Sequence, residues 1–220
     1  MPRRTQAGRT LSSRPDERRT YLSSVRSAAA AETRDRVIEA AARCLREDAG
    51  IASFSLDNVA KAARVTRLTV YNQFGSRRAL LEAVFDDIAR QGGLARIAQA
   101  MAMPDPRAAL NALVEIFCAF WSRDPAIGRL HDAMATDPEF ASALIERNER
   151  RRKALTVLVD RIAEDSASRR SRQDAVDMIF ALTSYAMFVM LRVSRSASEV
   201  CDLVRAACHR ALEPLEGSAS

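Results

Sequence analysis

The sequence predicts an all-α protein, and three observations carry that prediction. Hydrophobic residues make up 48% of the chain but aromatic residues only 5%, and Ala, Leu, Arg and Glu are abundant, which favours helices over sheets. Apolar residues recur at helical spacing along most of the chain. Ser, Thr and Asp residues stand repeatedly where such a stretch begins, as N-caps do. We therefore expect about nine or ten helices and no strand.

The first 31 residues predict a flexible basic arm. They contain seven Arg against two acidic residues, and few large apolar side chains among Ser, Thr, Gly and Pro. The first helix is expected to begin at Glu32, because an apolar stripe at helical spacing starts with Val37 and continues to Leu45. Gly50 supplies a backbone conformation that ends helices, so the helix should stop near it.

Three further helices are predicted from their capping residues. Ser55, Thr66 and Ser76 are each placed to accept a hydrogen bond from the first turn of the helix that follows. The second of these helices is short and ends near Phe74. The third is longer, and the glycines at positions 92 and 93 mark its end.

In the rest of the chain the same pair of residues, Asp followed by Pro, marks the start of a helix three times. An Asp that can cap a helix is followed by a Pro, whose fixed φ suits the first helical position, at Asp105-Pro106, Asp124-Pro125 and Asp137-Pro138. A strongly apolar helix is then expected over residues 173–193. The spacing of Ser196 and Glu199 is that of a capping box, which predicts a last helix reaching Leu212.

The net charge of +6 is concentrated near the N-terminus. Residues 32–78 hold nine basic against six acidic side chains, whereas residues 79–220 hold eighteen against twenty. A basic N-terminal region on a near-neutral remainder is typical of a phosphate-binding protein, because neutralised phosphates release counterions. Lys is almost absent while Arg is abundant, so a general bias toward Arg is the alternative explanation.

Residues 56–74 have the layout of a helix-turn-helix, with a short helix, a tight turn and a second short helix. In the second helix Val70 and Phe74 can pack inward, together with part of the Tyr71 ring. The side chains left facing outward offer donors, acceptors and a methyl group to base edges, and they are Arg67, Thr69, Asn72 and Gln73.

The stretch SLDNVAKAARVTRLTVYNQFGSRRALLEAV, from Ser55 on, resembles the N-terminal DNA-binding domain of the TetR family of bacterial transcriptional regulators. The resemblance covers about residues 32–90. It includes an aromatic pair three residues apart, Tyr71 and Phe74, and a basic residue, Arg77, at the start of the next helix. Arg64 departs from the family, which usually has Gly in the turn, and a left-handed non-Gly residue costs about 1 kcal/mol. Arg77 also stands where Lys is commoner.

The resemblance implies an N-terminal three-helix domain at 32–78 that carries the helix-turn-helix. A C-terminal helical domain for ligand binding and dimerisation would follow at 79–220. The residues it implies near bases are Arg67, Leu68, Thr69 and Asn72, and those near phosphates are Thr66, Tyr71, Gln73 and Arg77. The basic arm could add contacts in the minor groove, as the arms of other helix-turn-helix proteins do.

The resemblance also implies partners: palindromic double-stranded DNA, a small-molecule effector, and a second copy of the chain, bound through the last two helices. The apolar helix at 173–193 supports a homodimer, because it is hydrophobic on too many sides for a surface helix. Candidate effector-binding residues form aromatic and Met walls with few polar groups, and they are Phe117, Phe120, Trp121, Leu130, His131, Met134, Tyr185 and Phe188. The expected function is repression that a ligand relieves.

Other classes of function would require characteristic sequence motifs. With two His and no H-E-x-x-H, G-x-S-x-G or Gly-rich phosphate loop, the chain is not expected to be an enzyme, and no cofactor or metal is expected. Cys201 and Cys208 leave a metal-sensing regulator open, and an all-helical protein-binding adaptor also stays open. Without an export signal or an apolar run of about 20 residues, we expect a cytoplasmic protein outside the membrane.

Overall fold

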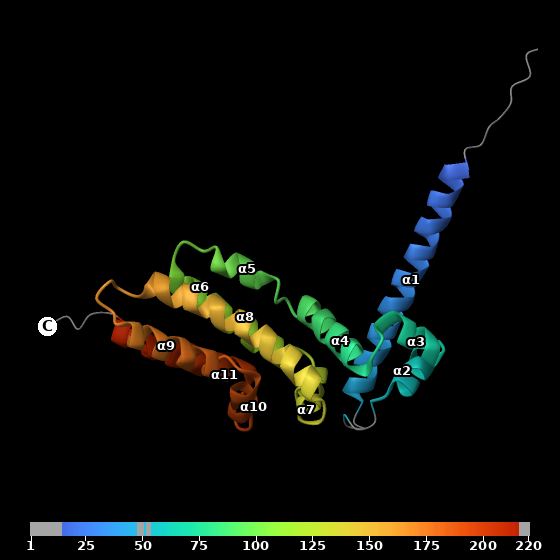
Figure 1. Ribbon diagram of the computed structural model, residues 1–220. Coiled ribbons are helices and arrows are strands. Elements are labelled where there is room, and N and C mark those ends of the chain that lie inside the picture. Colours follow the sequence, from blue (N-terminus) through green and yellow to red (C-terminus); the bar gives the residue numbers. More distant parts are fainter. Residues whose placement is uncertain (1–14, 48–50, 52–53, 216–220) are drawn as a thin grey trace, which may run out of the picture.

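The computed structural model describes residues 15–47, 51 and 54–215, with side chains from Arg26 onward. Within that part the protein is all-α, as the sequence predicted, with eleven α-helices and no strand (Figure 1). The helices and one 3-10 turn are α1 Pro15–Arg46, α2 Leu56–Ala63, α3 Arg67–Phe74, α4 Arg77–Gln91, α5 Arg96–Met101, α6 Pro106–Arg123, α7 Ala126–Thr136, α8 Pro138–Ile162, α9 Arg169–Leu182, α10 Tyr185–Arg192, α11 Ala197–Leu212 and η2 Glu213–Leu215.

The predicted capping residues begin the helices. The side chains of Ser55, Thr66 and Ser76 accept hydrogen bonds from the backbone N–H three residues on, at the starts of α2, α3 and α4. Asp137 does the same for α8. At the start of α11 the capping box of Ser196 is complete, since Glu199 also accepts from the Ser196 backbone N–H.

The flexible arm is a wrong prediction for residues 15–31, because α1 begins at Pro15 rather than Glu32. Residues 1–14 lie outside the described residues. From Arg26 to Glu32 every residue is exposed, so within the described residues this part of α1 buries no side chain and has no apolar stripe to reveal it. Local preference explains the helix instead, since Pro15 suits a first turn and residues 28–31 are four Ala.

The single apolar helix expected at 173–193 is also wrong, because the structure breaks it into α9 and α10 with a bend of 54°. In an unbroken helix the Thr183 carbonyl would accept the Met187 N–H. Here Met187 N–H bonds to the Ser184 side chain, and the Thr183 carbonyl accepts from Trp121 Nε1 at 3.1 Å and Arg151 Nη1 at 2.8 Å. Of the described helices, none alone is long and apolar enough to cross a membrane, and only this bent pair together reaches that length and composition.

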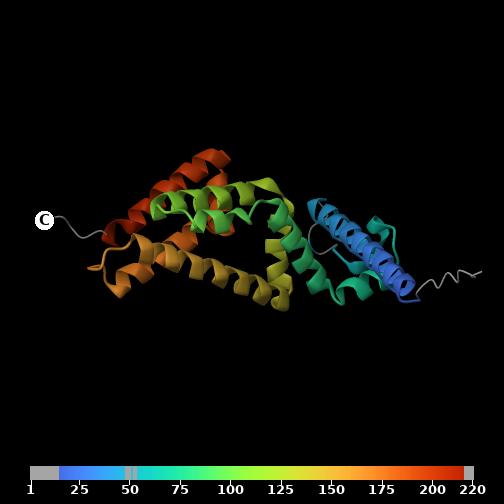
Figure 2. The same ribbon diagram turned by 90° about the horizontal axis from the view of Figure 1, so that it is seen from above.

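The molecule is elongated, with the N-terminal helices at one end and α5, α6, α8, α9 and α11 at the other (Figures 1 and 2). One buried cluster joins Val37 and Val70 to Phe120 of α6 and Phe140 of α8. A second cluster lies among α6, α8, α9 and α11. The predicted boundary after residue 78 falls in the first turn of α4, and the first cluster continues across it. As a result α4 belongs both to the N-terminal part of the molecule and to its C-terminal part.

The turn after α2 contains a non-glycine residue in the left-handed region, Arg64, with φ +56° and ψ +44°. We expect Arg64→Gly to raise the free energy of unfolding by up to about 1 kcal/mol, because glycine adopts this conformation without a Cβ clash. Ala62→Gly, inside α2, should lower it by about 1 kcal/mol. Urea denaturation measures both, and an Arg64→Gly protein no more stable than wild type would contradict the expectation.

Candidate nucleic-acid interface and effector cavity

The turn between α2 and α3 fixes the direction of the second helix. Arg64 N–H bonds to the Lys61 carbonyl at 3.2 Å and Val65 N–H to the Ala60 carbonyl at 3.0 Å, closing the end of α2. Two residues later Thr66 starts α3. Val70 and Phe74 are buried against the first cluster, so α3 is held by one side and its opposite side is left free.

The free side of α3 carries the predicted base-contact residues. Leu68 is 65% exposed and the Arg67 side chain 67% exposed, and Asn72 is exposed beside them. Tyr71 is 56% exposed, so its ring packs inward less than the sequence predicted. A large apolar side chain such as Leu68, with no partner in the described chain, fits a surface that another molecule covers.

Arg67 makes an ion pair with Asp57 of α2, with 3.0 Å between Nη1 and Oδ2. Both side chains are more than half exposed, and exposed pairs contribute only about 0–1 kcal/mol. The guanidinium can therefore leave this carboxylate for a base or a phosphate at small cost. The pair also keeps Arg67 on the outer side of the motif in the absence of DNA.

Gln73 lies at the junction of α3 with α1. Its side-chain amide reaches the Ala30 carbonyl at 3.5 Å, and its backbone carbonyl accepts a hydrogen bond of 2.9 Å from Arg34. The Arg34 guanidinium also stacks on the Phe74 ring, 4.3 Å from its centroid. The sequence reasoning did not single out Arg34, which holds the C-terminal end of α3, because only the fold brings α1 beside it.

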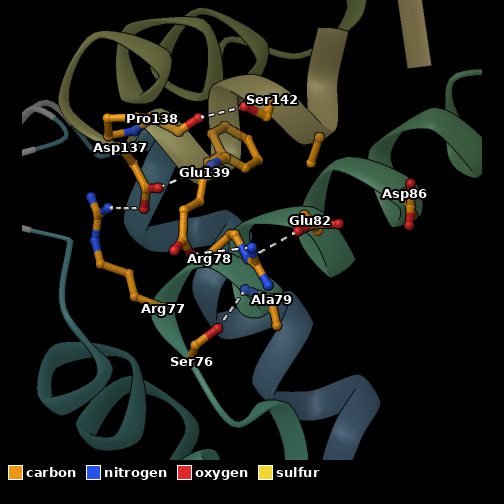
Figure 3. A network of polar contacts seen from close by, with 12 residues as sticks. Ser76, Arg77, Arg78, Ala79, Glu82, Asp86, Asp137, Pro138, Glu139 and Ser142 are labelled. Carbon is orange, nitrogen blue, oxygen red and sulfur yellow. Dashed lines mark hydrogen bonds and ion pairs between the residues drawn. The ribbon is translucent and has the colours of Figure 1, made fainter. Parts of the chain in front are cut away.

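Arg77 has partners inside the molecule, in contrast to the phosphate contact that the resemblance implied. Its Nε donates to the Phe54 carbonyl at 3.2 Å and its Nη1 lies 3.3 Å from Asp137 Oδ2 (Figure 3). Beside it, Arg78 pairs with Glu139 at 3.1 Å. Asp137 and Glu139 belong to the start of α8, so the two arginines join the N-terminal end of α4 to the C-terminal helices.

We expect Arg77→Ala to lower the free energy of unfolding by about 1–3 kcal/mol, because it leaves the half-buried Asp137 carboxylate and the Phe54 carbonyl without this donor. Arg78→Ala removes the same charge from a more exposed position and should cost within about 0.5 kcal/mol. Urea denaturation of the two variants makes the comparison. Equal losses would contradict the assigned role of Arg77.

Two cavities lie between α4 and the C-terminal helices. The large cavity has a volume of about 320 Å³ and the small cavity about 130 Å³. Phe117, Phe120 and Trp121 line the large cavity. The small cavity is lined, among the predicted residues, by Trp121, Leu130, His131, Met134 and Tyr185. Phe188 lines neither cavity and is buried in the second cluster.

Sequence reasoning missed the α8 wall, where Arg147, Asn148 and Arg151 line both cavities. In the sequence these residues lie in a charged stretch, which is typical of a helix face exposed to solvent. Arg147 pairs with Asp86 of α4 at 2.9 Å and with Glu82 at 3.4 Å. The wall of the cavities is thus tied directly to α4.

The cysteines give little support to a metal-sensing site. No group of three or more His, Cys, Asp or Glu side chains within the described ranges is arranged to hold a metal ion. Cys208 is fully buried, and burial raises the pKa values of Cys118 and Cys208 to about 12. A thiol that stays protonated is a poor ligand, because the thiolate is the metal-binding form.

The structure defines the class of two-domain helix-turn-helix proteins, in which α4 joins a helix-turn-helix with an exposed second helix to a helical domain that contains a cavity. Residues 37–84 match the model of the bacterial regulatory proteins of the tetR family. This match covers part of α1, the helix-turn-helix and the first half of α4, and over these residues the chain is similar to that family.

Three named proteins are similar to longer stretches of the chain. The chain is 32% identical over 111 residues to the HTH-type transcriptional regulator EthR of Mycolicibacterium smegmatis, and the match covers 50% of this chain and 51% of EthR. A TetR transcription regulator from Haloarcula marismortui has a similar fold, with a TM-score of 0.62 at 16% identity, over 84% of this chain and 98% of the other. NalD of Pseudomonas aeruginosa, the secondary repressor of the MexAB-OprM multidrug efflux pump, has a TM-score of 0.58 at 16% identity over 83% and 96%.

Proposed function

We propose that this protein is a sequence-specific DNA-binding transcriptional regulator that binds a palindromic operator. The observation that carries the proposal is the free side of α3, which presents Arg67, Leu68 and Asn72 outward while Val70 and Phe74 fix the helix from behind. A helix held in this way can enter the major groove and reach base edges. The proposed interface consists of Thr66, Arg67, Leu68, Thr69, Tyr71, Asn72 and Gln73, and Arg77 acts as the link to α8.

Dimerisation is part of the proposal, because two recognition helices about 34 Å apart read a palindrome. Its support is a set of exposed large apolar side chains on or beside the last three helices, Met178, Val189, Met190, Val193 and Leu203. Met190 is 70% exposed and Val193 is 87% exposed, although both are large hydrophobic residues. A second copy of the same surface would remove this area from water.

Met190→Glu is expected to shift the protein toward monomer, because the charge would have to be buried without a partner in the dimer. Sedimentation velocity across a range of concentrations measures the shift. Ile145→Glu places the same charge on α8, at a residue that is also exposed, and should leave the dimer intact. A dimer unaffected by Met190→Glu would place the interface elsewhere.

We further propose that an effector in the large cavity releases the DNA, so that the protein acts as a repressor. Phe85 and Ala89 of α4 line this cavity, while the start of α4 adjoins the reading motif. A ligand that favours one position of α4 would shift the population of DNA-binding dimers. Coupling of this kind is typically about 1–3 kcal/mol. Repression is supported by NalD, which is described as a repressor.

Selection of bound duplexes from a random pool tests the DNA-binding proposal. We expect the purified protein to enrich a palindrome, and the affinity for it to fall steeply with salt, because phosphate contacts release counterions. Removal of residues 2–14, which lie outside the described part of the chain, tests whether they add to that affinity. A stable monomer that enriches no sequence at low salt would support a protein-binding adaptor instead.

A further inference from the structure

The polar part of the cavity walls has an excess of positive charge. Arg147 and Arg151 line both cavities, and Arg150 lines the large one. The only carboxylate in either lining, within the described chain, is Asp86, and Arg147 is already paired with it at 2.9 Å. The pairing leaves Arg150 and Arg151 without a carboxylate in these linings, and of these two Arg150 is exposed to solvent whereas the Nε of Arg151 is buried.

Arg151 is held in place without a carboxylate. Its Nη1 and Nη2 donate to the carbonyls of Thr183 and Phe180, at 2.8 Å and 3.3 Å, at the break between α9 and α10. Its guanidinium lies 4.2 Å from the Phe180 ring centroid and 5.4 Å from that of Phe117. These contacts fix the direction of the group but leave its charge unbalanced.

The Nε of Arg151 is buried and has no hydrogen-bond partner. No acidic side chain in the described part of the chain forms an ion pair with this guanidinium. Burial and the neighbouring charge of Arg152 together lower the pKa of Arg151 to about 10, so the group stays protonated at neutral pH. A buried cation without a counter-ion is unfavourable, so an anion that reached it would gain a strong charge-assisted hydrogen bond.

The remaining walls suit an apolar body. Phe85, Phe117, Phe120 and Trp121 line the large cavity beside Arg151. Asn148 lines both cavities, and its amide has no hydrogen-bond partner among the residues the structure describes, so it can donate to a second oxygen. The volume of about 320 Å³ is at the lower end of cavities that hold small organic ligands.

We propose that the effector is an amphipathic organic carboxylate, with its carboxylate on Arg151 and Asn148 and its aromatic or alkyl body against Phe85, Phe120 and Trp121. This inference rests on the proposed function, in which the cavity takes an effector. It adds the chemical class of that effector. A neutral apolar molecule of the same shape would leave the Arg151 charge unpaired and should bind more weakly.

Trp121 is the single tryptophan of the chain and lines both cavities, so its fluorescence reports binding at this place. The probes are 4-phenylbutyrate and octanoate, each compared with its neutral primary amide, titrated into the purified full chain. We expect the carboxylates to change the Trp121 emission and to bind at least tenfold more tightly than the matched amides. Amides that bind as tightly as the acids, or acids that do not bind at millimolar concentration, would overturn the proposal.

Arg151→Gln should remove the preference for the acid, lowering carboxylate affinity about tenfold while amide affinity is unchanged. Arg152→Gln is the matched control, because it removes the same charge one residue along α8 at a position that lines neither cavity, and it should keep the preference. If Arg151→Gln fails to fold, Arg151→Lys retains the charge and should still favour the acid. A preference that survives Arg151→Gln overturns the assignment.

The proposed function is tested separately, by operator binding and its release. Amides that bind as tightly as acids and still release the operator would defeat the anion proposal and leave the regulator intact. A protein that binds the acids through Arg151 but enriches no duplex would defeat the regulator and leave the cavity assignment intact.

Discussion

Phe120→Ala should lower the free energy of unfolding by about 3–5 kcal/mol, the range for truncating a buried Phe. Phe120 is fully buried in the first cluster and packs edge-on against Phe85 of α4, with ring centroids 6.3 Å apart. It also fills the space over Gly92, where an added Cβ would come within 2.5 Å of its ring. The truncation would therefore leave a void between α4 and α6, which is where the two halves of the molecule meet.

Urea denaturation of the wild type and the variant measures this loss. Leu68→Ala is the control, because it shortens a large apolar side chain at an exposed position and should change stability by no more than about 0.5 kcal/mol. A loss below about 1 kcal/mol for Phe120→Ala would show that α4 and α6 can close over the void. In that event α4 would not be held as tightly as the contacts of Phe120 indicate.

The double variant Arg67→Ala with Asn72→Ala should lose the preference for the selected operator at two base positions. Each side chain is expected to contribute about 1–3 kcal/mol of discrimination, because both can bond to base edges in the major groove. Fold and stability should change little, since both residues are exposed and the ion pair of Arg67 with Asp57 is a surface pair. Competition between the operator and single-base variants measures the preference.

Arg170→Ala is the control for the double variant. Arg170 is an exposed arginine with its own surface ion pair, to Asp174, and it belongs to α9 at the opposite end of the molecule from α3 (Figure 1). Its removal should leave base preference unchanged. If the double variant keeps wild-type selectivity while folded, α3 is not the helix that reads the sequence.

The fold of the DNA-binding end could be predicted in detail because its signals are local. Ser55, Thr66 and Ser76 cap the helices that follow, and a cap depends only on residues two or three positions away. The inward positions Val70 and Phe74 followed from helical spacing for the same reason. The outward face of α3 was therefore identified before any tertiary contact was known.

Where the structure differs from the predictions made from the sequence, non-local contacts are the usual reason. The break at Thr183 depends on hydrogen bonds from Trp121 and Arg151, which are 62 and 32 residues away in the chain. Arg77 could serve a phosphate by its sequence position, but the fold places Phe54 and Asp137 around it. The segment 26–32 of α1 was missed for the opposite reason, because its residues are exposed and no burial imposes an apolar pattern on them.

By itself the sequence determined the helical class, the starts of most helices and the resemblance of residues 37–84 to the tetR family, because capping, periodicity and the helix-turn-helix spacing all act within a few residues. The tertiary structure alone decided which charges are balanced. Arg147 and Arg151 stand four residues apart on one helix, yet α4 supplies carboxylates to the first, and the second meets only carbonyls and aromatic rings. That difference arises because α4 packs beside Arg147 and the end of α9 packs beside Arg151, which no local pattern in the chain records.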